Sequence, residues 1–371
     1  GAADKLHGET IPYQAGMTVL TIREPHGVTG HIVPWNYPMQ IFGRSVGAAL
    51  AAGNACVVKP AEDACLSLLR VAELAAEAGF PEGALNIVTG YGAEAGAALS
   101  AHPGVDHISF TGSPVTGTAV AQAAAKHHCP VTLELGGKSP QIVFDDANLE
   151  EVAPVVLNAI VQNAGQTCSA GSRLLVHRPV YEALLERVGK AMSALRVGPA
   201  LADLDVGPLI RQNQLQRVWD FLSQAQRDGI PLAAQGHVME DAPQTGFYQA
   251  PTLLRDVPAN HRLAQDEVFG PVLGDAVRKR GAGHRARQRH ALRPGRRRLD
   301  ARRRAADADG AQAAFRPGVR QQLRRGRGCR VAVRWREVER LRARKGLRGA
   351  ARLHHAEDHR DQARIVEVNI R

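Results

Sequence analysis

Paired cysteines and long apolar runs are both missing from this 371-residue sequence. The five cysteines show no CxxC or paired spacing, which argues against a disulfide framework or a common zinc site and indicates a reducing compartment. The sequence contains no uninterrupted stretch of 18 apolar residues and no charged-then-apolar leader, so no membrane segment is expected. These absences predict a soluble, cytoplasmic protein. The length of 371 residues is sufficient for two ordinary domains.

Charge is distributed very unevenly along the chain, whose formal net charge is +11. Residues 1–275 carry 17 Lys and Arg against 27 Asp and Glu, whereas residues 276–371 carry 30 against 9, and 28 of those 30 are Arg. The basic character therefore belongs to the tail alone. A nucleic-acid-binding arm would fit this charge, but the tail contains only Phe315 and Trp335 as aromatic residues and no folded reader, so nucleic acid is not an expected partner.

The same tail, residues 276–371, has no apolar repeat of period 2 or 3.6 and cannot bury much surface, which predicts poor order. Synonymous codons for residues 289–303, read one base displaced, can encode ATPYGLVAGVWTRD. Residues 333–344 and 353–362 yield FGGVKSSGYGR and TTLKTIAI in the same phase. We therefore hypothesise a frameshift near residues 273–279, which resequencing of the gene would test.

Short β-branched runs alternate with longer stretches of helical character between residues 26 and 136. This order predicts a Rossmann-like domain with a parallel sheet and crossover helices. The expected strands are 28–34, 54–59, 84–88, 105–110 and 130–135, and the expected helices are 39–52, 65–79, 93–102 and 115–127.

Two further regions flank this domain. Residues 1–25 have apolar side chains at alternate positions and predict an extended hairpin, which would be marginal alone. Residues 137–275 predict a second α/β domain, with a boundary near Gly136–Gly137. Its expected helices are 149–164 and 179–195, and its expected strands are 140–144 and 173–177.

Three residues have the chemistry that oxidation of a carbonyl compound needs, although each has an ordinary structural explanation. Cys168 lies in GQTCSAG and could be a buried small hydrophobe, Glu134 lies in LELGGKSP and could be an exposed strand-end charge, and Asn36 in VPWNYP could form a turn. Together they supply a thiolate nucleophile, a carboxylate to activate water and an amide donor for an oxyanion.

The motifs VPWNYP, KPAE, FTGS, LELGGKSP, GQTCSAG and EVFGPV occur in the order found in the aldehyde dehydrogenase superfamily, which residues 1–275 resemble. The resemblance implies an NAD(P)-dependent oxidation of an aldehyde to a carboxylic acid. Cys168 would form a thiohemiacetal and then a thioester, with Asn36 and the Cys168 backbone N–H as the oxyanion hole. Glu134 would activate water for hydrolysis, a base that CoA-acylating relatives do not need.

The resemblance also implies a cofactor site. Lys59 and Glu62 in KPAE would receive the adenosine ribose, and because a carboxylate there repels a 2′-phosphate, NAD is favoured over NADP. Gly112 and Ser113 would contact the pyrophosphate at a helix N-terminus, and Gly117 completes the glycine-containing turn. For Lys59 and Glu62 the alternative is an exposed pair at a strand end.

Four more residues are assigned to cofactor binding on the same basis. Gly92 would allow a helix to approach the cofactor, or would be an ordinary turn glycine. Trp35 would line the pocket beside Asn36. Glu267 and Phe269 in EVFGPV would hold the nicotinamide ribose and ring, their alternatives being a strand-end carboxylate and a core phenylalanine.

Some features depart from the family pattern. Many relatives have a lysine nine residues after the asparagine, where this chain has Ser45 preceded by Arg44, so a water-relay role there is not carried over. The sequence starts inside the pattern, and after Asp275 nothing resembles the final strand that relatives return to their oligomer interface. A catalytically inactive fragment is therefore the alternative to an active enzyme. An intact chain is expected to form a homodimer or homotetramer through residues 1–25.

Overall fold

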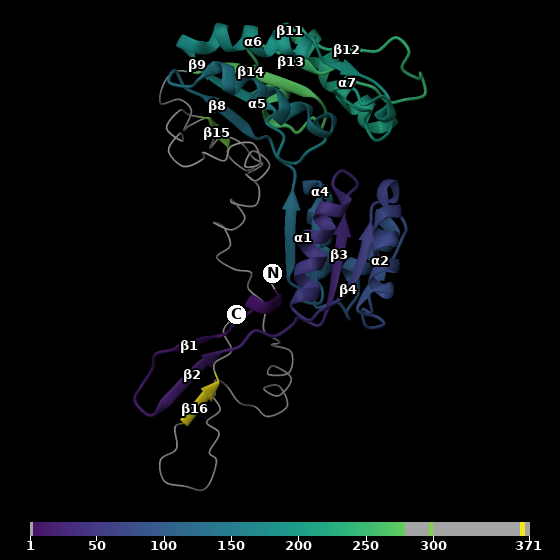
Figure 1. Cartoon of the computed structure of the whole chain (residues 1–371), viewed down its shortest axis with the longest axis vertical. Coiled ribbons are helices and arrows are strands. Elements are labelled where there is room, and N and C mark those ends of the chain that lie inside the picture. Colours follow the sequence, from purple (N-terminus) through teal and green to yellow (C-terminus); the bar gives the residue numbers. More distant parts are fainter. Residues whose placement is uncertain (1–2, 279–296, 300–363, 368–371) are drawn as a thin grey trace. The chain divides into compact units, whose positions relative to one another are not determined.

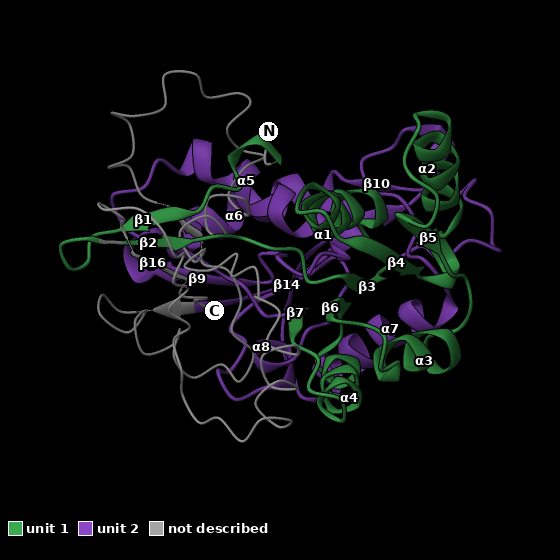
Figure 2. Ribbon diagram, turned by 90° about the horizontal axis from the view of Figure 1, so that it is seen from below, with its two compact units in different colours: residues 1–134, 325–371 green, residues 135–324 purple. Residues whose placement is uncertain are grey.

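The computed structural model describes residues 3–278, 297–299 and 364–367. The described residues divide into two compact units, shown in different colours in Figure 2. Unit 1 contains the residues up to Glu134 together with strand β16 (Arg364–Glu367), and unit 2 runs from Leu135 through strand β15 (Arg297–Leu299). The division falls close to the glycine pair at which the sequence predicted a domain boundary.

A five-stranded sheet with the order β5-β4-β3-β6-β7 forms the centre of unit 1 (Figure 1). Strand β3 pairs in parallel with β4 on one side and with β6 on the other, and β4 pairs in parallel with β5. The strands are β3 (Val28–Val33), β4 (Ala55–Pro60), β5 (Leu85–Ile87), β6 (His107–Gly112) and β7 (Val131–Leu135). The predicted Rossmann-like layout is confirmed.

Helices cover both faces of this sheet because successive strand residues point to opposite sides. The long helices of unit 1 are α1 (Pro38–Ala51), α2 (Leu66–Glu77) and α4 (Pro114–Ala125), joined by the short α3 (Ala97–Ala101). On one face Val33 and Val58 pack against Phe42 of α1 and Leu68 of α2. On the other, a second cluster joins the sheet to α4; its buried members are Val105, Ile108, Phe110, Val120, Ala124 and Cys129.

The predicted hairpin is present in unit 1 as β1 (Glu9–Ile11) and β2 (Met17–Thr21), which pair antiparallel. Strand β16 pairs in parallel with β2, so the expectation that no later strand returns to the hairpin is wrong. The tail does contain a suitable signal, because Ile365 and Val366 are adjacent β-branched residues, which favour an extended backbone.

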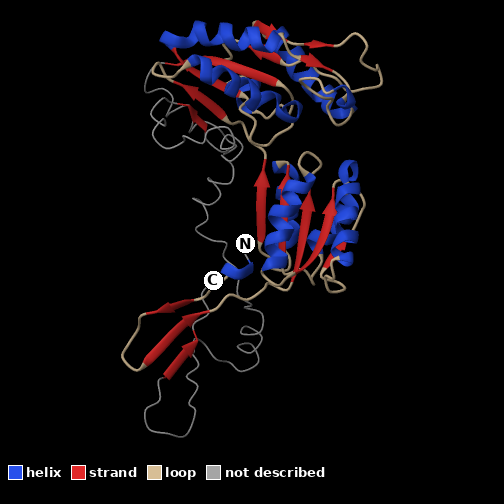
Figure 3. Cartoon of the chain, viewed as in Figure 1, coloured by secondary structure: helices blue, strands red, loops and turns tan. Residues whose placement is uncertain are grey.

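Unit 2 is built on a six-stranded sheet with the order β11-β13-β14-β9-β8-β15 (Figure 3). Its strands, besides β15, are β8 (Pro140–Val143), β9 (Arg173–His177), β11 (Leu232–Gln235), β13 (Thr252–Leu254) and β14 (Val272–Arg278). Helices α5 (Leu149–Val161) and α6 (Tyr181–Ser193) pack on one face around buried Val156, Leu174 and Leu184. Helix α7 (Gln212–Arg227) covers a second core that includes Phe221 and Val272.

Two predicted helices differ from the structure. The helix expected over 149–164 ends at Val161, because Asn163 and Ala164 have left-handed φ angles of 53° and 52° that cannot continue a right-handed helix. The helix expected over 93–102 consists of a π-helical segment (Gly92–Gly96) followed by the short α3. A single π-helical turn does not change the spacing of apolar residues enough to be recognised in the sequence.

Most of the tail, with the segments used for the frameshift hypothesis, lies outside the described residues. Within the described part of the chain, no helix combines the length and apolarity that a bilayer-spanning segment requires. The cytoplasmic location stays a prediction.

Candidate active site

The carboxyl edge of the unit 1 sheet brings several predicted site residues to one place. The chain progresses from β3 through β4 to β5 on one side, and then continues through β6 to β7 on the other. In open α/β sheets, ligands bind at such a change of direction. Trp35 and Asn36 follow β3, Gly112 ends β6, and Ser113 begins the next turn; both Trp35 and Asn36 are partly buried and engaged in contacts.

Lys59 and Glu62 lie at the end of β4, the neighbouring strand. The Lys59 side chain is almost fully buried, and its Nζ lies 3.3 Å from Glu62 Oε2, while the Glu62 side chain stays 39% exposed. The buried lysine therefore restricts the position of the Glu62 carboxylate, which is still partly exposed.

Ser113 is the N-cap of α4. Its Oγ accepts a hydrogen bond from the Thr116 backbone N–H at 3.2 Å, and Gly117 N–H donates to the Ser113 carbonyl at 2.9 Å. Gly92 begins the π-helical segment, and a Cβ there would meet no atom within 4 Å. Helix α4 thus starts directly after β6, where a helix N-terminus can accept an anionic group.

Glu134 lies near the end of β7, and its partner is Arg44. In the sequence this arginine is notable only as the neighbour of Ser45, which departs from the family pattern. Arg44 Nη1 on α1 lies 3.8 Å from Glu134 Oε2, and Arg44 Nη2 donates to Thr111 Oγ1 at 3.4 Å. The side chains of Arg44 and Glu134 are 38% and 45% exposed. Ser45 Oγ donates to the Ile41 carbonyl at 2.9 Å, so the hydroxyl bonds within its own helix.

Cys168 lies in unit 2, in the loop between α5 and β9, and is exposed. The segment before it is tightly fixed: Ala164, Gly165 and Gln166 are buried, and the Ile210 N–H donates to Gln166 Oε1 at 2.9 Å. Gly165 has φ +74°, and a Cβ there would lie 2.2 Å from the Gly270 carbonyl carbon. The thiol is therefore presented to solvent from a packed base that contacts the segment containing Glu267 and Phe269.

Glu267 packs over the glycine pair of LELGGKSP within unit 2. The Gly137 N–H donates to Glu267 Oε1 at 3.2 Å, and a Cβ on Gly136 would lie 2.1 Å from Glu267 Oε2. Burial raises the pKa of Glu267 to about 7, against the opposing effects of the Gly137 hydrogen bond and Lys138. Burial likewise lowers the pKa of Lys138, a 1% exposed residue, to about 7. Desolvation dominates at both groups.

Phe269 has a positive φ of 62°, which is unusual for a bulky residue. Side chains of α7 hold this backbone: Gln214 Nε2 donates to the Phe269 carbonyl at 2.7 Å and Arg217 Nε to the Val268 carbonyl at 3.2 Å. The EVFGPV segment is thus held by hydrogen bonds from a neighbouring helix as well as by the contact with Gly165.

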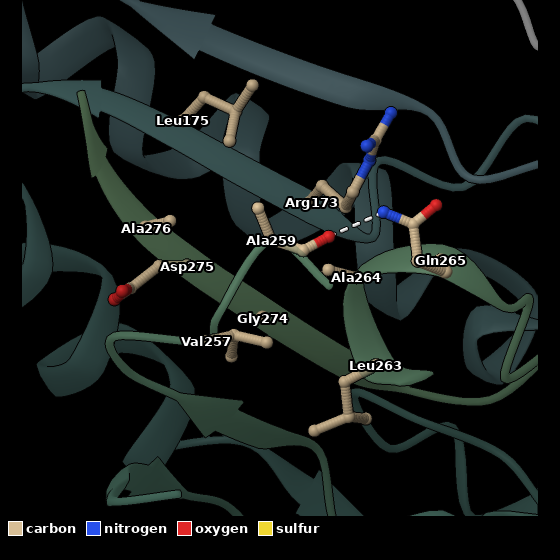
Figure 4. A pocket seen from close by; sticks show the side chains of 10 residues that line it. All are labelled: Arg173, Leu175, Val257, Ala259, Leu263, Ala264, Gln265, Gly274, Asp275 and Ala276. Carbon is tan, nitrogen blue, oxygen red and sulfur yellow. Dashed lines mark hydrogen bonds between the residues drawn. The ribbon is translucent and has the colours of Figure 1, made fainter. Parts of the chain in front are cut away.

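A separate pocket of about 40 Å³ in unit 2 is shown in Figure 4. Its lining includes Arg173, Leu263 and Asp275, and none of the predicted site residues. A space of this size fits water and is far smaller than a small-molecule site. It is therefore not a substrate pocket.

The structure brings together Lys59 with Glu62 and Ser113 with Gly117, and it places Cys168 in unit 2 and both Asn36 and Glu134 in unit 1. The sequence motifs did not indicate that Lys138, next to the glycine pair, is buried. Its position before the apolar run of β8 could have indicated its burial, because both faces of a central parallel strand are covered.

Comparison with known proteins identifies the family. The model of the aldehyde dehydrogenase family matches residues 1–274. The chain is 46% identical over 273 residues to hydroxyisobutyraldehyde dehydrogenase of Mycolicibacterium austroafricanum, covering 73% of this chain and 54% of that protein. It is 44% identical over 274 residues to the mitochondrial benzaldehyde dehydrogenase of Antirrhinum majus, covering 73% and 51%. The chain thus spans about half the length of these curated relatives.

Similar solved structures belong to the same family. A crystal structure of a protein from Burkholderia cenocepacia assigned to the aldehyde dehydrogenases shares 68% identity and a TM-score of 0.77, covering 81% of this chain and 68% of that one. The NAD⁺ complex of an aldehyde dehydrogenase from Bacillus cereus shares 38% identity and a TM-score of 0.75, covering 81% and 61%. The aldehyde dehydrogenase-like fold that the motifs predicted is confirmed, and the chain belongs to the aldehyde dehydrogenase family.

Proposed function

We propose that this protein oxidises an aldehyde to a carboxylic acid with NAD as the electron acceptor, through a covalent intermediate on Cys168. The observation that carries the proposal is the presentation of this thiol: Cys168 is exposed, while the preceding residues 164–166 are buried. A cysteine held only for packing would be expected among buried residues, as Cys56 and Cys129 are. An exposed thiol on a rigid support is suited to nucleophilic attack.

In the proposed reaction the Cys168 thiolate adds to the aldehyde carbonyl carbon and forms a thiohemiacetal. The Asn36 side-chain amide and the Cys168 backbone N–H donate hydrogen bonds to the oxyanion. NAD, when bound, supplies the acceptor for the hydride that leaves this carbon. Oxidation leaves a thioester on Cys168.

Glu134 is the proposed base for the second half of the reaction. Its carboxylate, partly exposed and therefore in reach of water, removes a proton from the water molecule that attacks the thioester carbonyl. The carbon–sulfur bond then breaks, the carboxylic acid leaves and the thiol is regenerated. Hydrolysis, rather than transfer of the acyl group to a second thiol, follows from the presence of this carboxylate.

The carboxyl edge of the unit 1 sheet fits NAD. Glu62, a partly exposed carboxylate next to buried Lys59, would bind the ribose hydroxyls, and Ser113 with Gly112 at the start of α4 would contact the pyrophosphate. Trp35, Gly92 and Gly117 complete this side of the proposed site. The family resemblance further assigns Glu267 and Phe269 to the nicotinamide ribose and ring. The Bacillus cereus relative, whose structure is an NAD⁺ complex, supports this choice.

An absorbance assay tests the proposal. The purified chain, mixed with propanal or benzaldehyde and NAD, is expected to form NADH and the corresponding acid, and NADP is expected to be the poorer acceptor. Cys168→Ser should abolish NADH formation, whereas Ser169→Ala, an exposed neighbour in the same loop, should retain it. A folded wild-type chain that is as inactive as Cys168→Ser contradicts the proposal and indicates an inactive fragment.

We also propose that the hairpin, residues 1–25, mediates self-association into a dimer or tetramer. Its exposed apolar side chains include Tyr13 at 64%, Leu20 at 40% and Ile22 at 51%. Apolar surface of this kind favours burial against another protein. Light scattering after size exclusion is expected to show an oligomer that a Tyr13→Ser, Ile22→Ser variant weakens; a monomeric wild-type chain would contradict this role.

A further inference from the structure

Arg44 connects α1 to the ends of two strands of the unit 1 sheet. One guanidinium nitrogen contacts Glu134 on β7 and the other donates to Thr111 on β6, so the guanidinium has contacts in two directions. Since the rigid fork of arginine fixes the direction of its donors, two contacts restrict the position of the group far more than one. The Glu134 carboxylate therefore lies beside a positive charge that also contacts Thr111.

The neighbouring position excludes a simple proton relay through this helix. Ser45 donates its hydroxyl proton to Ile41 of its own helix, and an arginine side chain does not lose its proton in proteins. Arg44 can therefore orient a carboxylate, but it cannot pass a proton to or from it.

The same geometry argues that Arg44 contributes little to folding. Both side chains of the ion pair are more than one-third exposed, the nitrogen–oxygen distance is 3.8 Å, and the hydrogen bond to Thr111 is long at 3.4 Å. Ion pairs this exposed contribute between zero and about 1 kcal/mol of stability. A residue that is unimportant for stability but placed against the proposed base is a candidate for positioning that base.

We propose that Arg44 is a positioning residue for hydrolysis: its guanidinium, anchored on Thr111, holds the Glu134 carboxylate in the orientation that accepts the proton of the attacking water. This inference rests on the proposed function, in which Glu134 is the hydrolytic base. It predicts that loss of Arg44 slows breakdown of the thioester and leaves its formation unchanged.

The test uses 4-nitrophenyl acetate, which separates the two steps without NAD. The Cys168 thiolate attacks the ester carbonyl and 4-nitrophenolate leaves, giving an acetyl thioester and a rapid burst of colour. Water, losing its proton to Glu134, then attacks the thioester, the carbon–sulfur bond breaks, and acetate leaves as the thiol regains a proton. The slower steady rate after the burst measures this hydrolysis.

Arg44→Met is expected to keep the burst amplitude and rate but to lower the steady rate at least about tenfold, because a misplaced base loses much of its contribution. Arg44→Lys should recover part of the rate, and Thr111→Val, which removes only the anchor, should show a smaller decrease. Arg70→Met is the matched control, since Arg70 forms exposed ion pairs with Glu73 and Glu77 on α2 and should behave as wild type.

The outcomes separate this inference from the proposed function. Wild-type chain without a burst contradicts the role of Cys168, and a burst with an unchanged steady rate in Glu134→Gln contradicts the role of Glu134. If Glu134→Gln slows hydrolysis while Arg44→Met does not, the positioning role of Arg44 is wrong. A parallel loss of burst and steady rate in Arg44→Met, with a lower urea midpoint, would assign Arg44 a structural role and also overturn the inference.

Discussion

The two units differ in the room that they leave around their site loops. In unit 1, a Cβ added to Gly92 would meet no atom within 4 Å, whereas in unit 2 a Cβ on Gly165 or Gly136 would lie 2.2 Å or 2.1 Å from its nearest neighbour. At Gly112, another proposed residue of unit 1, an added Cβ would lie 2.6 Å from the Phe110 side chain, so the open space in unit 1 is at Gly92. Unit 2 presents Cys168 and Glu267 from loops packed against other segments, so its site depends more on close packing.

The units also bury different ionisable groups. Unit 1 contains His31, 2% exposed, whose pKa is lowered to about 4 by desolvation and by the nearby His107. Unit 2 contains Glu267 and Asp275, whose pKa values are raised by desolvation to about 7 and about 6. Loss of water favours the neutral form in every case, but the resulting dependence of stability on pH has opposite sign.

Gly165→Ala tests the difference in packing and should have the largest effect. The new methyl group would collide with backbone atoms of Gly270 at a φ of +74°, so the free energy of unfolding should fall by about 3 kcal/mol or more. Urea denaturation measures the change. Gly92→Ala is the control in unit 1 and should leave the urea midpoint nearly unchanged. Equal midpoints for the two variants would show that packing around Gly92 and Gly165 does not differ.

His31→Gln tests the histidine of unit 1. Between pH 4 and 6.5 the unfolded chain binds a proton at His31 that the folded chain does not, so wild-type stability rises with pH across this window. Lowering the pKa of His31 from 6.5 to about 4 corresponds to about 3 kcal/mol in the free energy of unfolding, which is lost as the pH falls to 4. Urea titrations at several pH values should show a flatter profile for His31→Gln, while His237→Gln, at an exposed position, keeps the wild-type slope.

Glu267→Gln tests the carboxyl group of unit 2. The folded chain binds a proton at Glu267 between pH 4.5 and 7 that the unfolded chain releases, so stability from this group is present at low pH and is lost as pH rises through 7. We expect Glu267 to contribute about 2 kcal/mol to the free energy of unfolding at low pH, less than the full pKa shift would give, because the residue is partly exposed. The variant should lose less stability than wild type between pH 4.5 and 7. An identical loss, matching exposed Glu240→Gln, would contradict this assignment.

His128→Gly should have the smallest effect. This exposed residue of unit 1 follows α4 with a φ of 59°, a conformation that glycine adopts without strain. Removal of the backbone strain should outweigh the free-energy cost of the greater conformational entropy of the unfolded chain. The variant should therefore be more stable by about 0.5 kcal/mol. Lys126→Gly, at a right-handed φ of −60°, should instead lower the thermal midpoint, and a decrease in both variants would show that the strain at His128 is unimportant.

Sequence patterns predicted the five sheet strands of unit 1 and, in unit 2, β8 and β9, because these strands alternate with helices and contain β-branched residues. They did not predict β11, β13, β14 and β15 of the unit 2 sheet. They did not predict the left-handed Asn163 and Ala164, since neither residue breaks the apolar period of α5, and the close approach to Gly270 that accompanies this turn is a tertiary contact. The motifs indicated Glu134 and Cys168 directly. The contact between Arg44 and Glu134 depends on the tertiary packing that brings the Arg44 side chain of α1 to Thr111 on β6 and Glu134 on β7, which local patterns do not encode.

The exposure of Cys168 makes the chain convenient for spectroscopy. Among the cysteines of the described residues, Cys56 and Cys129 are buried and Cys65 is partly so, which makes Cys168 the thiol most open to a maleimide dye. Because the preceding Gly165 packs against Gly270, a dye on this loop would rotate with unit 2 instead of independently. Its fluorescence anisotropy would therefore report the tumbling of that unit, and an aldehyde that occupies the thiol would block the labelling.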